Sequence, residues 1–208
     1  GPHGPYTTVH DHVWAIKNDS TIESSQDTTS PLWVTYSNIG TNVRAMNGIF
    51  AFNNMVVVGK EDGLWAYADV AAGISVNDFI NITPEFDRHP STSHFTRGLA
   101  FMGWLYMNTR RGMVRYNGSE LQDVSGVVTG AQLADFGGRI RAFSLDSSWL
   151  YILMDTPSSD ASATKTTWLL TLDESGGFHI HTTHKLSIGD IYDAYTFYNG
   201  TNTHLYIA

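Results

Sequence analysis

The sequence predicts an all-β fold made of repeated units of four antiparallel strands, and three features of the chain support this prediction. An apolar run recurs five times, starting at residues 13, 55, 104, 149 and 204. A second apolar run precedes each of the later four copies, and short turns with glycine separate several of the runs, as in β-hairpins. Three of the recurring runs are apolar on both faces, which is typical of a strand covered from two sides.

The recurring run is expected to be the second strand of each unit. Three of its copies contain Leu-Tyr at their centre, whereas the first copy, Val-Trp-Ala-Ile, is the most divergent. Because both faces of these strands are apolar, we expect Leu105, Tyr106, Leu150 and Tyr151 to be buried, and each second strand to be more buried than the turn that follows it. The five copies are residues 13–16, 55–58, 104–107, 149–152 and 204–207.

The flanking runs supply the other expected strands. The first strand of each later unit carries a Phe preceded by Ala or Thr, at 51–52, 100–101, 142–143 and 196–197. The third strand is predicted at 32–38, 64–69, 113–118 and 169–174, and the fourth at 78–83, 121–128 and 177–183. The connection between the second and third strands is short in the second and third units and long in the first and fourth. In the fourth unit it is expected to be an exposed Ser-rich loop at 155–165. A single turn of helix is expected at 131–136.

A four-stranded repeat of about 40–50 residues has the length of a β-propeller blade. We predict a single domain, 1–208, with about four blades and a partial fifth, which is either a complete propeller or part of a larger one. A two-layer β-sandwich is the alternative. The strand ending at Ile207 should pair with the N-terminal segment, with further chain, or with a neighbouring subunit, because a free edge invites pairing. The expected units lie near 6–45, 46–93, 94–136, 137–190 and 191–208.

Composition excludes several classes of partner. Lys and Arg number 12 against 20 Asp and Glu, for a net charge of -8, so binding to a nucleic-acid backbone is not expected. The chain has no cysteine, which excludes disulfides and thiol nucleophiles. No apolar run reaches the ~18 residues of a transmembrane helix, so membrane insertion is not expected.

Catalytic motifs are absent from the sequence. It contains no G-x-S-x-G, H-E-x-x-H, P-loop or G-x-G-x-x-G pattern. His179 and His181 share one face of a predicted strand, as do His10 and His12, and two neighbouring imidazoles can chelate a metal. No third ligand is indicated, so we interpret these rings as solvent-facing and predict neither a metal nor a cofactor. The sequence therefore predicts a protein without enzymatic activity.

Two further patterns bear on binding. Sequons for N-glycosylation occur at Asn18, Asn81, Asn117 and Asn199, and they matter only if the chain is made in a secretory setting. Six tryptophans fall in predicted strands, where packing between sheets is expected of them, although an exposed tryptophan could stack on a sugar or a base. They are Trp14, Trp33, Trp65, Trp104, Trp149 and Trp168.

The stretches "GKEDGLWAYAD" at 59–69 and "GWLYMNTRRGMVRYNGSEL" at 103–121 resemble the degenerate propeller modules of virion and tail-associated proteins of tailed phages. This resemblance implies a structural or interaction module of a virion or another extracellular assembly, with protein partners or neighbouring subunits; a cytoplasmic location is also compatible with the sequence. A carbohydrate-binding propeller is the first alternative and a glycoside-hydrolase-type propeller the second. The turns between second and third strands differ from unit to unit, which favours the interaction module over a repeated lectin site.

Overall fold

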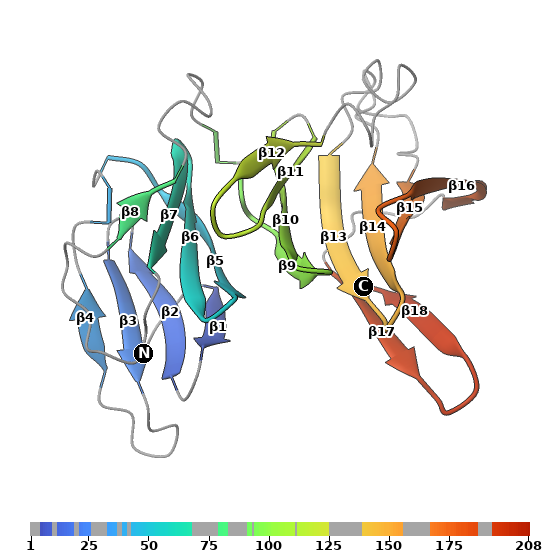
Figure 1. The fold of residues 1–208 in the computed structure, drawn as a ribbon, viewed down its shortest axis with the longest axis horizontal. Coiled ribbons are helices and arrows are strands. Elements are labelled where there is room, and N and C mark those ends of the chain that lie inside the picture. The colour runs from blue at the N-terminus through green and yellow to red at the C-terminus, as the bar shows by residue number, and fades with distance from the viewer. Residues whose placement is uncertain are drawn as a thin grey trace. The chain divides into compact units, whose positions relative to one another are not determined.

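A computed structural model describes residues 5–9, 12–18, 21–25, 33–36, 39–40, 43–67, 79–82, 91–92, 94–110, 112–124, 139–155, 167–186 and 193–208. All secondary structure in these residues is β-strand (Figure 1). They include no helix that is long and apolar enough to cross a membrane. The expected turn of helix at 131–136 and His10 lie outside them, as does the expected loop at 155–165 apart from Asp155, which ends a strand. The prediction of an all-β fold is confirmed.

The first two sheets each consist of four consecutive strands in chain order, with every neighbouring pair antiparallel. The first sheet contains β1 (Tyr6–Val9), β2 (His12–Asn18), β3 (Thr21–Ser25) and β4 (Val34–Tyr36). The second contains β5 (Met46–Phe52), β6 (Met55–Lys60), β7 (Gly63–Tyr67) and β8 (Ile80–Asn81).

The third and fourth sheets repeat this order of strands, and a two-stranded antiparallel sheet, here called the terminal hairpin, follows them. The third sheet contains β9 (Gly98–Phe101), β10 (Trp104–Asn108), β11 (Met113–Tyr116) and β12 (Leu121–Asp123). The fourth contains β13 (Arg139–Leu145), β14 (Trp149–Asp155), β15 (Thr167–Asp173) and β16 (Phe178–Leu186), and the terminal hairpin contains β17 (Ala194–Tyr198) and β18 (Thr203–Ile207).

The predicted second strands are confirmed in all five places, since they lie within β2, β6, β10, β14 and β18. Leu105, Tyr106 and Leu150 are buried as expected, and Tyr151 is half-buried. The expectation of burial is wrong for β18, in which Leu205 and Ile207 are half-buried and the remaining residues are exposed.

The prediction for the third strand of the first sheet is also wrong. Residues 34–36 form β4, the fourth strand, while the third strand is β3, which begins three residues after β2 ends. The sequence of β3, Thr-Ile-Glu-Ser-Ser, has one aliphatic residue, yet all five side chains are buried. Glu23 is tolerated there because Lys17 and Thr35 on the adjacent strands donate hydrogen bonds to its Oε1.

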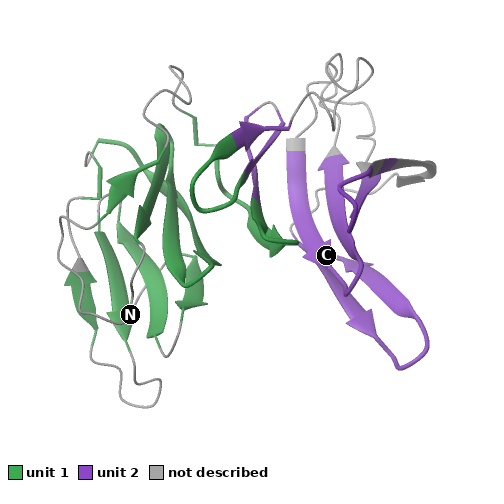
Figure 2. Cartoon of the chain, in the orientation of Figure 1, with its two compact units in different colours: residues 1–105, 116–121 green, residues 106–115, 122–208 purple. Residues whose placement is uncertain are grey.

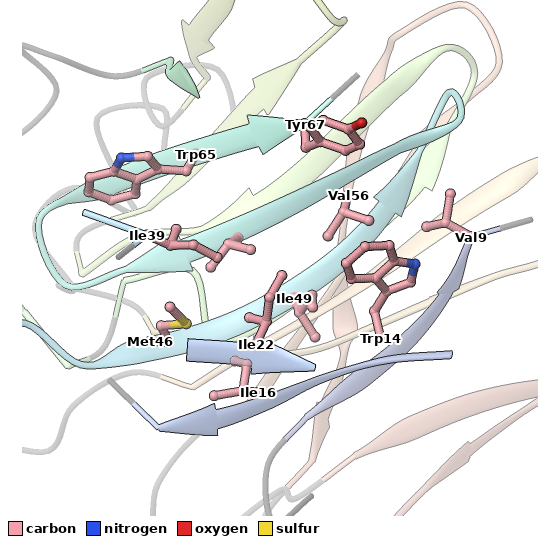
Figure 3. Packing of buried hydrophobic residues seen from close by; sticks show 11 residues of the cluster. Val9, Trp14, Ile16, Ile22, Ile39, Met46, Ile49, Val56, Trp65 and Tyr67 are labelled. Carbon is pink, nitrogen blue, oxygen red and sulfur yellow. The ribbon is translucent and has the colours of Figure 1, made fainter. Parts of the chain in front are cut away.

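The chain divides into two compact units (Figure 2). Unit 1 comprises residues 1–105 and 116–121, and unit 2 comprises residues 106–115 and 122–208. The core of unit 1 lies between the first and second sheets, where Trp14 and Ile22 face Ile49 and Val56 (Figure 3). The structure thus buries the divergent first copy of the repeat, around Trp14, against the second sheet.

The second sheet is covered on both faces, as the apolar character of its second strand predicts. All six residues of β6 are buried. On the face away from the Trp14 cluster, the Phe52 ring lies 6.0 Å from that of Tyr116 in β11. Phe95, fully buried in the segment before β9, packs over Gly59, where an added Cβ would lie 2.4 Å from the Phe95 Cβ.

In unit 2, the terminal hairpin packs on one face of the fourth sheet. Leu205 and Ile207 contact a small core that includes Ala142 and Leu153. Thr196 Oγ1 donates a hydrogen bond to the Leu145 carbonyl, which ties the first strand of the hairpin to the first strand of the sheet. The N-terminal strand β1 lies at the edge of the first sheet and pairs with β2. In the described residues, β18 pairs with β17 alone.

Candidate functional site

A groove lies in unit 2, between the β13–β14 turn of the fourth sheet and the turn end of the terminal hairpin. Its volume is about 460 Å³, within the range of small-molecule sites. We call it the inter-sheet groove, and its lining residues are Leu145, Asp146, Ser147, Thr196, Tyr198 and Thr203.

Asp146 anchors the groove because the turn holds its carboxylate in place. Oδ1 accepts hydrogen bonds from the backbone N–H groups of Ser148 and Trp149, each at 2.9 Å, and Oδ2 accepts one from the Tyr151 hydroxyl, also at 2.9 Å. Burial on its own raises the pKa of Asp146, but these bonds and one from Thr203 outweigh it and lower the pKa below the usual value. The carboxylate is therefore ionised at neutral pH.

Tyr151 shares this network. Burial raises its pKa to about 12, and the hydrogen bond to the charged Asp146 adds to the shift. Its hydroxyl thus stays protonated and donates to Asp146 throughout the physiological range.

The turn of the terminal hairpin forms the other wall of the groove. Asn199 Oδ1 accepts hydrogen bonds from the N–H groups of Thr201 and Asn202, at 3.0 and 2.8 Å, which fixes the turn. Tyr198 is 63% exposed, and its hydroxyl donates to the Gly200 carbonyl at 2.8 Å. An exposed aromatic ring is therefore held at the rim by a bond to its own turn.

Three further side chains, those of Trp149, Asp173 and His179, extend the site across one face of the fourth sheet. The strand register pairs Trp149 with Asp173 and places both Tyr151 and His179 opposite Thr171, so these side chains share one face. His179 Nε2 lies 2.9 Å from Asp173 Oδ2, and the His179 ring meets the Trp149 ring edge-on at 5.7 Å. Trp149 remains 37% exposed beside the pair formed by His179 and Asp173. We call Trp149, Asp173 and His179 together the Trp149 rim.

Asp173 is fixed by its own turn, between β15 and β16. Its Oδ1 accepts hydrogen bonds from the Ser175 hydroxyl and the Gly177 N–H. The Ser175 bond, followed by those from His179 and Gly177, holds the pKa of Asp173 well below its usual range. The site therefore carries two ionised carboxylates, from Asp146 and Asp173.

Of the candidate metal ligands, His179 pairs with Asp173. The strand register places His179 opposite Thr171 and His181 opposite Leu169, so the two positions share one face of β16 as the sequence predicts. The His12 ring lies 6.1 Å from the Trp14 ring. Within the described residues, no group of three or more His, Asp or Glu side chains is arranged to hold a metal ion.

The sequon asparagines occupy strand ends and turns. Asn18 and Asn81 lie on β2 and β8 and are exposed, as is Asn199 in the hairpin turn. Asn117 is half-buried, and its Oδ1 accepts hydrogen bonds from Ser119 and Glu120 in the β11–β12 turn. The structure thus gives Asn117 and Asn199 a role in organising turns.

Sequence reasoning missed the residues that line the inter-sheet groove. The stretch Asp146-Ser-Ser-Trp149, between two apolar runs, is a recognisable Asx-turn sequence and could have indicated a fixed carboxylate. Thr196, Tyr198 and Thr203 come about fifty residues later, and only the packing of the hairpin on the sheet brings them to Asp146.

Unit 1 contains a groove at the corresponding strand ends, with a volume of about 340 Å³. Its lining combines apolar residues with Asn53 and Asn54 of the β5–β6 turn, and its described lining residues include no carboxylate. The carboxylate of Asp146 distinguishes the inter-sheet groove in unit 2 from this one.

Comparisons with known proteins show a likeness in structure alone. No family model matches the sequence, and no curated protein matches it. The chain is similar to the extracellular domain of a protein assigned as a hybrid two-component system from B. thetaiotaomicron, with 14% identity and a TM-score of 0.62 over 98% of this chain and 25% of that one. An extracellular domain assigned to a one-component system of the same organism gives 13% identity and a TM-score of 0.61 over the same shares.

The chain thus spans about a quarter of the length of these two solved structures, and at such identities the similarity shows the fold alone. Luciferin-regenerating enzyme is matched at 8% identity and a TM-score of 0.45, over 92% of this chain and 78% of that one. That likeness is too weak to bear on fold or activity.

Proposed function

We propose that this chain is part of a β-propeller and serves, without enzymatic activity, as an interaction module of an extracellular assembly such as a virion. The first strands of successive sheets support the propeller, because β1 contacts β5, β5 contacts β9, and β13 contacts β17. Inner strands of neighbouring blades lie side by side in this way. The solved structures with TM-scores above 0.6 are extracellular domains, which supports that location.

The observation that carries the interaction role is an exposed aromatic surface on the terminal hairpin. Tyr195, Phe197 and Tyr206 are 57%, 54% and 45% exposed. The register pairs Tyr195 with Tyr206 and Phe197 with His204, so all three rings lie on the face opposite to Leu205 and Ile207. The rings of Tyr195 and Tyr206 stack at 5.0 Å. We call these three residues the aromatic face; apolar patches of this kind mark interaction surfaces.

The occupant proposed for the aromatic face is the aromatic face of a second copy of the chain. The register places Tyr195, Phe197, His204 and Tyr206 on this side of the hairpin, and none of these four residues is Asp, Glu, Lys or Arg. The same face of two copies can therefore meet about a two-fold axis without like-charge repulsion, and the exposed rings of both copies become buried against each other.

Light scattering coupled to size-exclusion chromatography, over a series of protein concentrations, tests this proposal. The wild-type chain should be dimeric, and the triple variant Tyr195→Ser, Phe197→Ser, Tyr206→Ser should be monomeric. Tyr6→Ser is the matched control, because Tyr6 is a strand tyrosine in unit 1 with 76% exposure, and it should leave the dimer intact. A wild-type chain that stays monomeric at every concentration, or a dimer that survives the triple substitution, contradicts the proposal.

A further inference from the structure

We propose that the inter-sheet groove and the adjoining Trp149 rim bind an uncharged oligosaccharide. This site lies on the face of the fourth sheet that the hairpin partly covers, away from the aromatic face of the hairpin. The inference is therefore independent of the proposed dimer.

Trp149 supplies the surface on which a sugar ring can stack. Its indole is partly exposed, and it is held in position by the His179 ring at its edge and by the bond from its backbone N–H to Asp146. A sugar presents C–H groups on one face and hydroxyls at its edge, and an amphipathic aromatic side chain matches the first of these. The Tyr198 ring, which lines the groove, offers a second such surface.

The polar groups of the groove match sugar hydroxyls. Ser147, Tyr198 and Thr203 each contribute a hydroxyl to the groove or its rim, and a hydroxyl both donates and accepts hydrogen bonds. Asp146 is held by four hydrogen-bond donors, so its neighbours are already fixed before a ligand arrives. Such preorganisation lowers the entropy that binding costs.

Charge indicates which class of sugar the site takes. Asp146 and Asp173 are both ionised, the described residues that line the groove include no Lys or Arg, and the chain carries a net charge of -8. A uronate, a sialic acid or a phosphorylated sugar would meet like charge at short range. An uncharged glycan meets hydrogen-bond acceptors and aromatic surface.

Isothermal titration calorimetry of the full chain tests the inference with defined probes. The uncharged probes are the hexasaccharides of cellulose, chitin and amylose, and the acidic probe is an oligogalacturonate of the same length. We expect heat of binding with at least one uncharged probe and none with the acidic one. Trp149→Ala should weaken that binding at least ~10-fold, as removal of a central aromatic contact does.

Trp104→Ala is the matched control, since Trp104 also begins the second strand of its sheet, and it should bind as the wild type does. His179→Ala, which removes an exposed ring from the rim, repeats the test if Trp149→Ala fails to fold. No binding of any of the three uncharged probes overturns the inference. Equal binding of the acidic probe, or unchanged affinity in both rim variants, overturns it as well.

Discussion

Leu150-Tyr151 in β14 and Leu205-Tyr206 in β18 are the same dipeptide at the same position of the repeat, yet their burial differs. Leu150 is fully buried and Tyr151 half-buried, whereas Leu205 is half-buried and Tyr206 is 45% exposed. β14 has a strand on either side, while among the described residues β18 has β17 alone as its neighbour. The number of neighbouring strands and sheets therefore decides burial, and an apolar strand can leave one of its faces open for a partner.

The largest expected effect is a difference between two leucine truncations. Leu150→Ala should lower the free energy of unfolding by ~2–5 kcal/mol, because it leaves a cavity within a closed core. Leu205→Ala should cost about 1 kcal/mol, since a half-buried side chain loses less transfer free energy and the site can relax. Urea denaturation of both variants measures the difference, and equal losses would contradict the comparison.

A smaller effect is expected where a side chain is added instead of removed. Gly59→Ala in β6 places a Cβ within 2.4 Å of the Phe95 Cβ, so overpacking should cost ~1–3 kcal/mol. Tyr206→Trp adds volume on the exposed face of β18 and should change stability by less than about 0.5 kcal/mol. Thermal unfolding of both proteins is the measurement.

A double-mutant cycle sharpens this second prediction. If the Phe95 side chain causes the overpacking, Gly59→Ala combined with Phe95→Ala should lose less stability than the sum of the two single changes. Additive losses would place the strain elsewhere, for instance at the Phe95 backbone carbonyl, which lies 3.1 Å from the added Cβ.

The sequence predicted the second strands well because their signal is local. An apolar run of four residues, bounded by turn residues, carries the information for β6, β10 and β14. The same reasoning failed at β3, where Glu23 and two serines are buried and an ion pair with Lys17 replaces apolar character. A pattern of hydrophobicity does not reveal a polar strand whose buried side chains are hydrogen-bonded by residues on the adjacent strands.

The candidate site could be predicted only in part. Asp146 follows from its turn sequence, and the face shared by Trp149 and His179 follows from strand parity once the register is known. The groove itself depends on the hairpin packing on the fourth sheet, which places Thr203 beside Asp146. Such contacts between distant segments are set by tertiary packing and leave no short motif.

The smallest expected effect concerns the hydroxyl of Tyr151. Tyr151 and Tyr206 occupy the same position in their repeat units. Tyr151→Phe removes a donor from Asp146 and should cost about 1 kcal/mol at neutral pH, whereas Tyr206→Phe should change stability by less than about 0.5 kcal/mol.

Because the pKa of Tyr151 is raised from 10.0 to about 12, the folded chain keeps this proton at pH values where the unfolded chain loses it. The resulting stability is fully present below pH 10.0 and is lost as the pH rises towards 12. The tyrosinate absorbance of the folded protein should therefore contain a component that rises near pH 12, and Tyr151→Phe should lower the amplitude of this component by that of one tyrosine. Burial also raises the pKa of Tyr116, so Tyr116→Phe in the same background separates its contribution. If the amplitude near pH 12 is unchanged in Tyr151→Phe, Tyr151 is not the partner of Asp146, and the burial difference between the two dipeptides does not extend to their hydroxyl groups.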